Sequence, residues 1–519
     1  MKSLIYIIVL SALTLTHYGQ SLDKQGRKNL KQANYFLEME DYVTAYFKFQ
    51  DLKENYELDF DIEFGLGRCK LRQKGHEKNA LAYLEPIHST KNYENFYYYL
   101  GLAYHWNGRF EEAINCFQTV LIDRNRTMDD APVLEALNKA YNSQELITAK
   151  RKVEINNLGA DINTENQESV PVVLPNNAGM FFTARRADNV SNKKDYLDYN
   201  FQDIYFSKLH QYKWEQPVNL KDINSELHDA SASISSDGSQ FVYFKTNPIK
   251  VTGGDLYIAD CDSAGNLTNN HKLSDEINTE YIESSACFSP DGNTIYFSSN
   301  RPGGYGGFDI YKSNKLPNGE WGKVINLGPN INTRFNEDAP FLHYDATTLY
   351  FSSDGHLGMG GFDIFFTKMN SAGIWRKPEN IGYPINTINH DMYITVLPDE
   401  RSAYFSSDRE GGYGNDDIYK VDILDHESFK KVVRGTVVDI STGKAITTKI
   451  TVINEEDHNL NGIYRSNPNN GNFIMVVRPM EYYQFIVEAA GYQTMTINFS
   501  YEDLNEIEEL NINLKPIVE

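Results

Sequence analysis

The chain of 519 residues has few cysteines, a shortage of basic residues and no long apolar run after its first 20 residues. It holds 49 Lys and Arg against 71 Asp and Glu, which gives a net charge of -22. Because phosphate binding depends on Lys and Arg, this shortage argues against a nucleic-acid partner. No later segment approaches the roughly 18 apolar residues of a membrane span, so we expect no transmembrane helix.

The four cysteines are Cys69, Cys116, Cys261 and Cys287, and none forms a C-x-x-C pair. None lies near the N-terminus, so an acceptor for a lipid anchor is missing. Buried free thiols are the expected state. The spacing of Cys261 and Cys287 would permit a disulfide between them but does not establish one.

The motifs of several enzyme classes are also missing. The 12 histidines form no H-E-x-x-H pair, and there is no G-x-S-x-G elbow. Gly-rich stretches at 301–309, 355–363 and 409–417 lack the Lys-Ser/Thr of a phosphate loop, so we expect irregular crossings between strands. We therefore predict no catalytic residue, no metal and no cofactor, and that the chain is not an enzyme. A three-carboxylate glycosidase funnel stays open, since carboxylates abound.

Residues 1–20 combine Lys2 with an apolar run from Leu4 to Leu15. This pattern is typical of a secretory signal peptide. We expect an exported protein, in the periplasm or associated with the outer membrane.

Residues 21–150 have helical periodicity. In 97–121 the residues Leu100, Gly101, Tyr104, Gly108, Phe110, Ala113 and Phe117 follow the spacing of a tetratricopeptide repeat. Ala45, Ala80 and Ala113 lie 35 and 33 residues apart, near the 34-residue period. About three repeats are predicted, with a groove for a partner protein that includes Tyr104.

Residues 153–425 contain a repeat of about 54 residues, which predicts a five-bladed β-propeller of four-stranded units. One register mark is the Asp that opens a D-[IL]-[YF] strand, at Asp203, Asp255, Asp309, Asp363 and Asp417. A second is Ile-Asn-Thr/Ser, at Ile162, Ile223, Ile277, Ile331 and Ile385. A third is a tight-turn Asp, at Asp237, Asp291, Asp345 and Asp399.

The two ends of this repeat are out of phase. Residues 153–168 match the outer-strand segment 323–338, whereas the last unit lacks such a segment. We expect strand 153–160 to complete the last blade, which closes the propeller without an open edge.

The five repeated Asp residues could form a ring of carboxylates around the channel or cap backbone N–H groups at turns. We favour the structural role, because a substrate is asymmetric and catalytic residues should be asymmetric too. Three residues of the Gly-rich stretches occupy matching positions and are candidates for a recognition surface, with local packing as the alternative: Tyr305, Met359 and Tyr413.

Residues 432–519 alternate apolar and polar positions around turns such as Thr442–Gly443. Six or seven short strands are expected, which predicts an all-β sandwich.

The repeats 288–313 and 404–421 resemble the TolB-like, WD-repeat-like propeller blades of bacterial envelope proteins. Segment 435–494 resembles the carboxypeptidase regulatory-like, transthyretin-type sandwich. The order of modules is similar to a Bacteroidota envelope family that continues into an OmpA-like, peptidoglycan-binding domain and includes a type IX secretion accessory protein. No OmpA-like domain follows Glu519 here, so peptidoglycan binding is not implied.

The resemblance implies a non-catalytic exported scaffold that contacts envelope proteins through the tetratricopeptide groove and the propeller face, associated with type IX secretion or gliding machinery. The alternative is a glycan-binding protein or glycoside hydrolase built on the propeller, with asymmetric carboxylates and aromatics at one mouth of the channel. A third possibility is a soluble periplasmic binding module of a transport complex. The net negative charge lies mainly on residues 151–431, which suits solubility or a basic partner.

Overall fold

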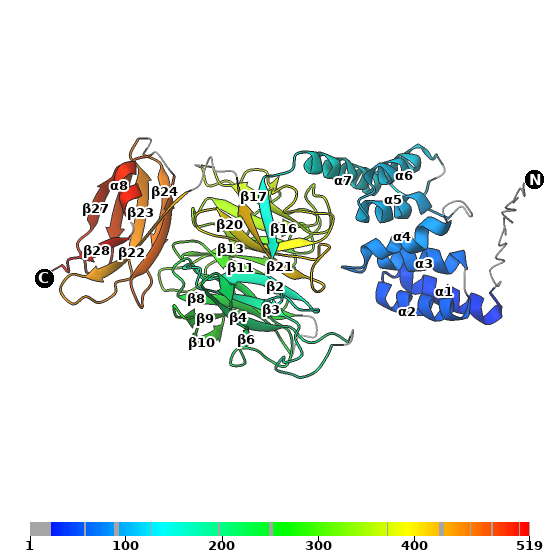
Figure 1. Cartoon of the computed structure of the whole chain (residues 1–519), viewed down its shortest axis with the longest axis horizontal. Helices are drawn as coiled ribbons and strands as arrows, with labels where there is room; N and C mark the ends of the chain where they lie inside the picture. The colour runs from blue at the N-terminus through cyan, green and yellow to red at the C-terminus, as the bar shows by residue number, and fades with distance from the viewer. Residues whose placement is uncertain are drawn as a thin grey trace, which may run out of the picture. The chain divides into compact units, whose positions relative to one another are not determined.

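The computed structural model describes residues 22–56, 59–87, 93–124, 126–195, 198–248, 253–370, 372–424, 430–456, 458–478, 481–507 and 509–517. The predicted signal peptide lies outside these residues. The chain divides into two compact units, 1–141 and 142–519, which are described separately. A helical N-terminal region followed by a large β-rich region is confirmed (Figure 1). No helix among the described residues is long and apolar enough to cross a membrane.

Antiparallel helix pairs form the first unit (Figure 1). Glycines allow them to approach closely, because a Cβ on Gly65 would lie 2.2 Å from Phe49 and one on Gly101 would lie 2.6 Å from Phe117. Both phenylalanines are fully buried. The helices are α1 (Lys24–Glu38), α2 (Tyr42–Asn55), α3 (Phe60–Lys70), η1 (Glu77–Asn79), α4 (Ala80–Leu84), η2 (Glu85–Ile87), α5 (Phe96–Trp106), α6 (Phe110–Ile122) and α7 (Asp130–Thr148).

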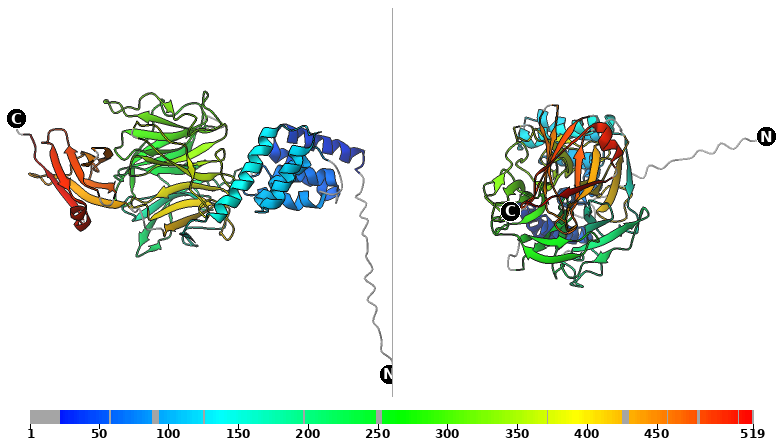
Figure 2. Two further views of the ribbon diagram at one scale, coloured as in Figure 1. Left: turned by 90° about the horizontal axis from the view of Figure 1, so that it is seen from above. Right: turned by 90° about the vertical axis from the view of Figure 1, so that its left-hand side faces the viewer.

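Five antiparallel sheets, which we call the ring, follow between residues 153 and 423 (Figures 1 and 2). Each has an inner first strand and an outer fourth strand, and β5 (Lys213–Trp214) is added to the first sheet. In order within each sheet, the strands are β2 (Glu168–Val173), β3 (Gly179–Ala184), β4 (Asp203–His210) and β6 (Val218–Asn219); β7 (Asp229–Ile234), β8 (Gln240–Thr246), β9 (Gly254–Cys261) and β10 (Leu267–Lys272); β11 (Glu283–Phe288), β12 (Thr294–Ser299), β13 (Asp309–Asn314) and β14 (Ile325–Asn326); β15 (Glu337–Leu342), β16 (Thr348–Ser353), β17 (Asp363–Lys368) and β18 (Glu379–Asn380); and β19 (Asp391–Val396), β20 (Ser402–Ser407), β21 (Asp417–Ile423) and β1 (Val153–Asn157).

The ring is closed. Each inner strand contacts the inner strand of the next sheet, and β19 contacts β2. The outer strand of the fifth sheet is β1, which pairs antiparallel with β21 so that Ile155 lies opposite Val421. No edge is therefore left between the first and last sheets.

The Asn of each Ile-Asn segment holds the ring together. Asn163 accepts a hydrogen bond from the N–H of Ile418 at 2.9 Å and donates to its carbonyl at 2.9 Å. The other four asparagines bracket a third-strand residue in the same way: Asn224 at Ile204, Asn278 at Leu256, Asn332 at Ile310 and Asn386 at Ile364. Among these five asparagines, only Asn163 joins the first segment of the ring to the last, since its partner Ile418 lies in β21. Its two hydrogen bonds therefore support the pairing of β1 with β21.

The C-terminal sheet pair comprises residues 431–514. One sheet has the order β25-β22-β28 and the other β24-β23-β26-β27, and they share an apolar core that includes Val437, Phe473 and Phe485. The elements are β22 (Lys431–Asp439), β23 (Lys449–Asn454), β24 (Leu460–Arg465), β25 (Asn472–Val477), β26 (Tyr483–Glu488), β27 (Met495–Phe499), α8 (Tyr501–Glu506) and β28 (Leu510–Leu514).

The described cysteines are buried and free. Cys261 lies in β9 and Cys287 in β11, and no bridge joins them.

Candidate functional site

The two ends of the ring differ in what they expose. We call the end at which the inner strands begin the loop end, because it carries the Gly-rich loops and the Ile-Asn segments. The opposite end, where inner strands finish in tight turns, is the turn end. Strand alternation places every second-to-third-strand loop at the loop end and every tight-turn Asp at the turn end.

A buried carboxyl group marks the start of every inner strand at the loop end. Each is 0 % exposed and accepts a backbone N–H from a Thr or Ser four residues earlier, at 2.5 to 3.0 Å. These groups belong to Glu168, Asp229, Glu283, Glu337 and Asp391. They repeat with the spacing of the Ile-Asn segment and escaped the sequence analysis, although that spacing could have revealed them.

The partners of these acids differ between sheets. Three form ion pairs at 2.7 to 3.2 Å: Glu168 with Arg186, Glu283 with Arg301 and Asp391 with Arg409. In the second and fourth sheets, Lys245 and His356 instead donate to the carbonyls of Ile223 and Ile331. Burial, with no arginine to offset it, raises the pKa of Asp229 and that of Glu337 to about 7. Two of the five acids therefore hold a proton near neutral pH.

Three further positions at the loop end break the fivefold repeat. Asp338 follows Glu337, where the other sheets have Ser169, Ala230, Ser284 and Met392. Tyr393 stands where the others have Val170, Ser231, Ser285 and Ala339. Asp416 stands where the others have Gln202, Gly254, Phe308 and Phe362.

Asp338 and Asp416 both act electrostatically on Tyr393. Burial raises the pKa of its phenol, and the charges of Asp338 and Asp416 raise it further. Its backbone has a φ of 57°, and the matching residues Val170 and Ala339 have φ values of 53° and 54°, so this conformation belongs to the repeat and only the side chain departs from it. The phenol therefore stays protonated and can donate a hydrogen bond.

Asp338 is held by the neighbouring inner strand. Its Oδ1 accepts hydrogen bonds from the Ser284 hydroxyl at 2.9 Å, from the Ser285 hydroxyl at 2.5 Å and from the Ala339 N–H at 2.7 Å. Because Oδ1 accepts all three, these hydrogen bonds leave Oδ2 to face other groups.

Asp416 belongs to a polar chain of side chains. Gln167 donates to Asp416, and Arg185 donates to Gln167 at 2.9 Å and to Asp195 at 2.9 Å. This chain fixes the orientation of the Asp416 carboxyl group, which is 8 % exposed.

The five repeated Asp residues of the third strands are buried at the loop end. Asp309 accepts the N–H of Tyr305 at 2.6 Å and Asp417 that of Tyr413 at 2.5 Å, and Asp363 accepts the N–H of Met359 at 2.7 Å. Asp203 accepts the N–H of Val190, and Asp255 forms an ion pair with Lys272.

Two of the four candidate recognition residues are buried. Met359 is 0 % exposed, and Tyr104 is 8 % exposed with Arg109 stacked over its ring at 4.4 Å, so neither offers an exposed side chain to a partner. Tyr305 and Tyr413 are 52 % and 53 % exposed. The envelope-protein partners stay a prediction.

At the turn end, the C-terminal sheet pair docks onto the ring. Arg465 contacts Oδ2 of Asp237, and Asn467 donates to the Asp237 carbonyl at 2.9 Å. Tyr344 of the ring packs with Ile474 and Val476 of the sheet pair. The tight-turn Asp is therefore more than a turn residue here, which its local sequence does not reveal.

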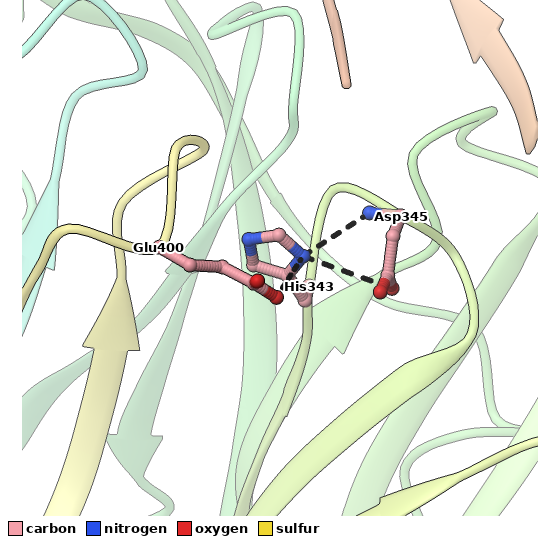
Figure 3. Close-up of side chains that lie close together, drawn as sticks. All are labelled: His343, Asp345 and Glu400. Atoms are coloured by element: carbon pink, nitrogen blue, oxygen red, sulfur yellow. Dashed lines mark hydrogen bonds and ion pairs between the residues drawn. The ribbon is translucent and has the colours of Figure 1, made fainter. Parts of the chain in front are cut away.

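A second turn-end cluster comprises His343, Asp345 and Glu400 (Figure 3). The Lys430 ammonium contacts Asp345 and lies 3.0 Å from Glu400. Burial opposes ionisation of Asp345, but His343 and Lys430 outweigh it, so the pKa of Asp345 lies well below its ordinary value.

No known protein family matches the chain, and no curated protein matches it. Among solved structures it resembles an endo-arabinase of Bacteroides thetaiotaomicron (14 % identity, 51 % of this chain and 98 % of that one, TM-score 0.34). It also resembles an α-L-arabinofuranosidase of Lactobacillus brevis (10 % identity, 50 % and 90 %, TM-score 0.33). A catechol 1,2-dioxygenase variant of Acinetobacter radioresistens matches 17 % of this chain, which spans about half (52 %) of that enzyme, at 14 % identity and TM-score 0.13.

The prediction of a non-catalytic exported scaffold is wrong, and so is the prediction that the chain is not an enzyme, because the solved structures that resemble the chain are enzymes, several of them glycosidases. At these identities and TM-scores, the solved structures resemble the chain only in the arrangement of their strands. The case for a function therefore rests on the residues of this chain.

Proposed function

We propose that this chain is a glycan-binding protein or glycoside hydrolase whose sugar meets the loop end of the ring. The observation that carries the proposal is the loss of fivefold symmetry at Asp338, Tyr393 and Asp416. A repeated residue serves the repeated fold, whereas a sugar presents different groups on its different sides. Residues that depart from the repeat at one mouth are therefore the candidates for contact with it.

The residue types suit this chemistry. Glycosidases use two carboxyl groups, one as proton donor and one as base or nucleophile. Asp338, whose Oδ1 accepts three hydrogen bonds and is thereby held in place, is one of the two carboxyl groups. The second carboxyl group is Asp416, and the protonated Tyr393 phenol supplies a hydrogen-bond donor to a sugar oxygen.

Two observations support the loop end as the ligand face. The C-terminal sheet pair occupies part of the turn end through its contacts with Asp237 and Tyr344. Half-exposed Tyr305 and Tyr413 offer aromatic surface on the loops of the loop end, and aromatic rings are amphipathic contact surfaces.

In finer terms, we propose that the ring is a five-bladed β-propeller closed by β1, since five similar sheets surround five inner strands. The helix pairs are proposed as three tetratricopeptide-like repeats followed by α7. The C-terminal sheet pair is proposed as a carboxypeptidase regulatory-like sandwich. Export is proposed from the sequence of residues 1–20.

The test combines a glycan array with a reducing-sugar assay on the full chain. We expect a defined set of glycans to bind, and Asp338→Asn, Tyr393→Phe and Asp416→Asn each to lower binding or turnover at least tenfold. Asp291→Asn is the matched control, because Asp291 lies in a tight turn at the opposite end. The proposal would be contradicted if neither assay gave a signal, or if Asp291→Asn lowered binding or turnover as much as the other three substitutions.

A further inference from the structure

We propose that His343, Asp345 and Glu400 (Figure 3) form a site for a divalent metal ion of the Zn²⁺ type. The Lys430 ammonium holds the place of the ion. The site lies at the turn end of the ring and is independent of the glycan proposal. One imidazole nitrogen and two carboxylate oxygens are ligands that Zn²⁺ accepts.

The spacing of the three side chains fits ligands of one ion. His343 Nδ1 lies 3.7 Å from Asp345 Oδ1 and 3.6 Å from Glu400 Oε1. Both distances are too long for hydrogen bonds. Two ligands on a tetrahedral Zn²⁺, each about 2.1 Å from the ion, lie about 3.4 Å apart. The two separations from His343 therefore exceed this value by only a few tenths of an ångström, and all three ligand atoms lie within 4.8 Å of one another.

The His343 ring is oriented as a metal ligand. Its Nε2 lies 3.3 Å from the Leu397 carbonyl, and its Nδ1 lies 3.3 Å from the Asp345 N–H. Nε2 therefore carries the proton, and the Nδ1 lone pair accepts the Asp345 N–H in a long contact that an ion bound at Nδ1 would replace. Metal-binding histidines commonly donate their other ring N–H to a backbone carbonyl in this way. The side chain is 0 % exposed, so the packing fixes this orientation.

Lys430 shows that the cluster attracts a cation. Its Nζ contacts Asp345 and lies 3.0 Å from Glu400, so its single charge offsets one of the two carboxylate charges. Lys430 also lines, with Asp345, a crevice of about 700 Å³ between the ring and the C-terminal sheet pair, which gives an ion a route to the cluster. Metal and Lys430 therefore compete, and binding withdraws one contact that joins β22 to the ring.

The experiment is titration of the full chain with ZnCl₂ by isothermal calorimetry, checked by equilibrium dialysis with metal analysis. We expect one Zn²⁺ per chain. Glu400→Gln, which keeps shape but removes a charged ligand, should weaken binding more than about tenfold, since even outer-shell partners change metal affinity that much. Lys430→Met should tighten binding, because it removes the competing ammonium.

Asp399→Asn is the matched control, because it removes a neighbouring carboxylate of the same turn that is outside the cluster. It should leave the affinity unchanged. Circular dichroism at 25 °C checks that each variant is folded. Absence of Zn²⁺ binding by the unaltered chain would overturn the proposal, and so would binding that Glu400→Gln and Asp399→Asn weaken equally.

Discussion

Arg465 and Asp237 form an ion pair across the junction between the C-terminal sheet pair and the ring, with Arg465 Nη2 2.7 Å and Nε 2.8 Å from the same Asp237 oxygen. The Asp237 side chain is 1 % exposed. Burial opposes its ionisation, but Arg465 and the hydroxyls of Ser235 and Ser239 outweigh burial and lower the pKa of Asp237. The junction therefore depends on the buried Asp237 carboxylate, which needs the positive charge of Arg465 beside it.

Arg465→Ala should lower the free energy of unfolding of the ring and sheet pair by about 3 kcal/mol, because it leaves a buried carboxylate without its counter-charge. Urea unfolding followed by tryptophan fluorescence measures this change. Arg401→Ala is the control: Arg401 lies 3.9 Å from Asp399 on the surface, and such pairs contribute under about 1 kcal/mol. Equal effects of the two substitutions would contradict a special role for Arg465.

The stability of the ring should fall as pH rises from about 4 to about 7. The pKa values of Asp229 and Glu337 are about 7 in the folded chain, whereas in the unfolded chain both groups lose their protons near pH 4. The folded state therefore binds more protons across this window, and the free energy of unfolding decreases with pH until about pH 7.

Asp229→Asn and Glu337→Gln should each flatten this pH dependence, because an amide resembles the protonated acid and does not titrate. Urea unfolding at pH 4.5, 5.5, 6.5 and 7.5 measures the slope. Asp291→Asn, at the turn end, should leave it unchanged. A slope that both amide variants share with the unaltered chain would refute the assignment.

Gly65→Ala should destabilise the helical unit by about 1–3 kcal/mol, although alanine favours helix by about 1 kcal/mol. The added Cβ would lie 2.2 Å from the buried Phe49 ring. Thermal unfolding followed at 222 nm measures the loss. Thr119→Ala, on an exposed helix position, should be neutral or slightly stabilising. An unchanged midpoint for Gly65→Ala would show that Phe49 moves away at little cost.

Asn163→Ala should release β1 from the fifth sheet. It leaves the buried N–H and carbonyl of Ile418 without partners, at a cost of about 2–3 kcal/mol. Hydrogen exchange of the β1 and β21 amides should accelerate. Asn332→Ala removes the same two bonds within one sheet and should leave β1 protected. Equal exchange of β1 in both variants would show that the Asn163 bracket does not secure the closure.

The order of helical and β-rich regions could be predicted because periodicity and repeat spacing are local properties. The 54-residue register carried the information for the third-strand Asp residues and for the out-of-phase strand at 153–157. The same register also contained the five inner-strand acids, and an alignment of the units would have isolated Asp338 and Tyr393 as departures from the repeat.

The junction at the turn end could not be predicted. Asp237 and Asp345 have the sequence of ordinary turn residues, and their partners Arg465 and Lys430 are 228 and 85 residues away. Exposure was equally hidden: Met359 and Tyr413 occupy matching positions, yet one is fully buried and the other is half exposed. Such contacts depend on which elements the fold brings together.

The pairing of β1 with β21 also determines when the fifth sheet can form. Val153 pairs with Ile423, so the fifth sheet cannot form until the chain is complete through residue 423. A chain that stops before residue 417 lacks β21, so β1 keeps an unpaired edge that can pair with another chain.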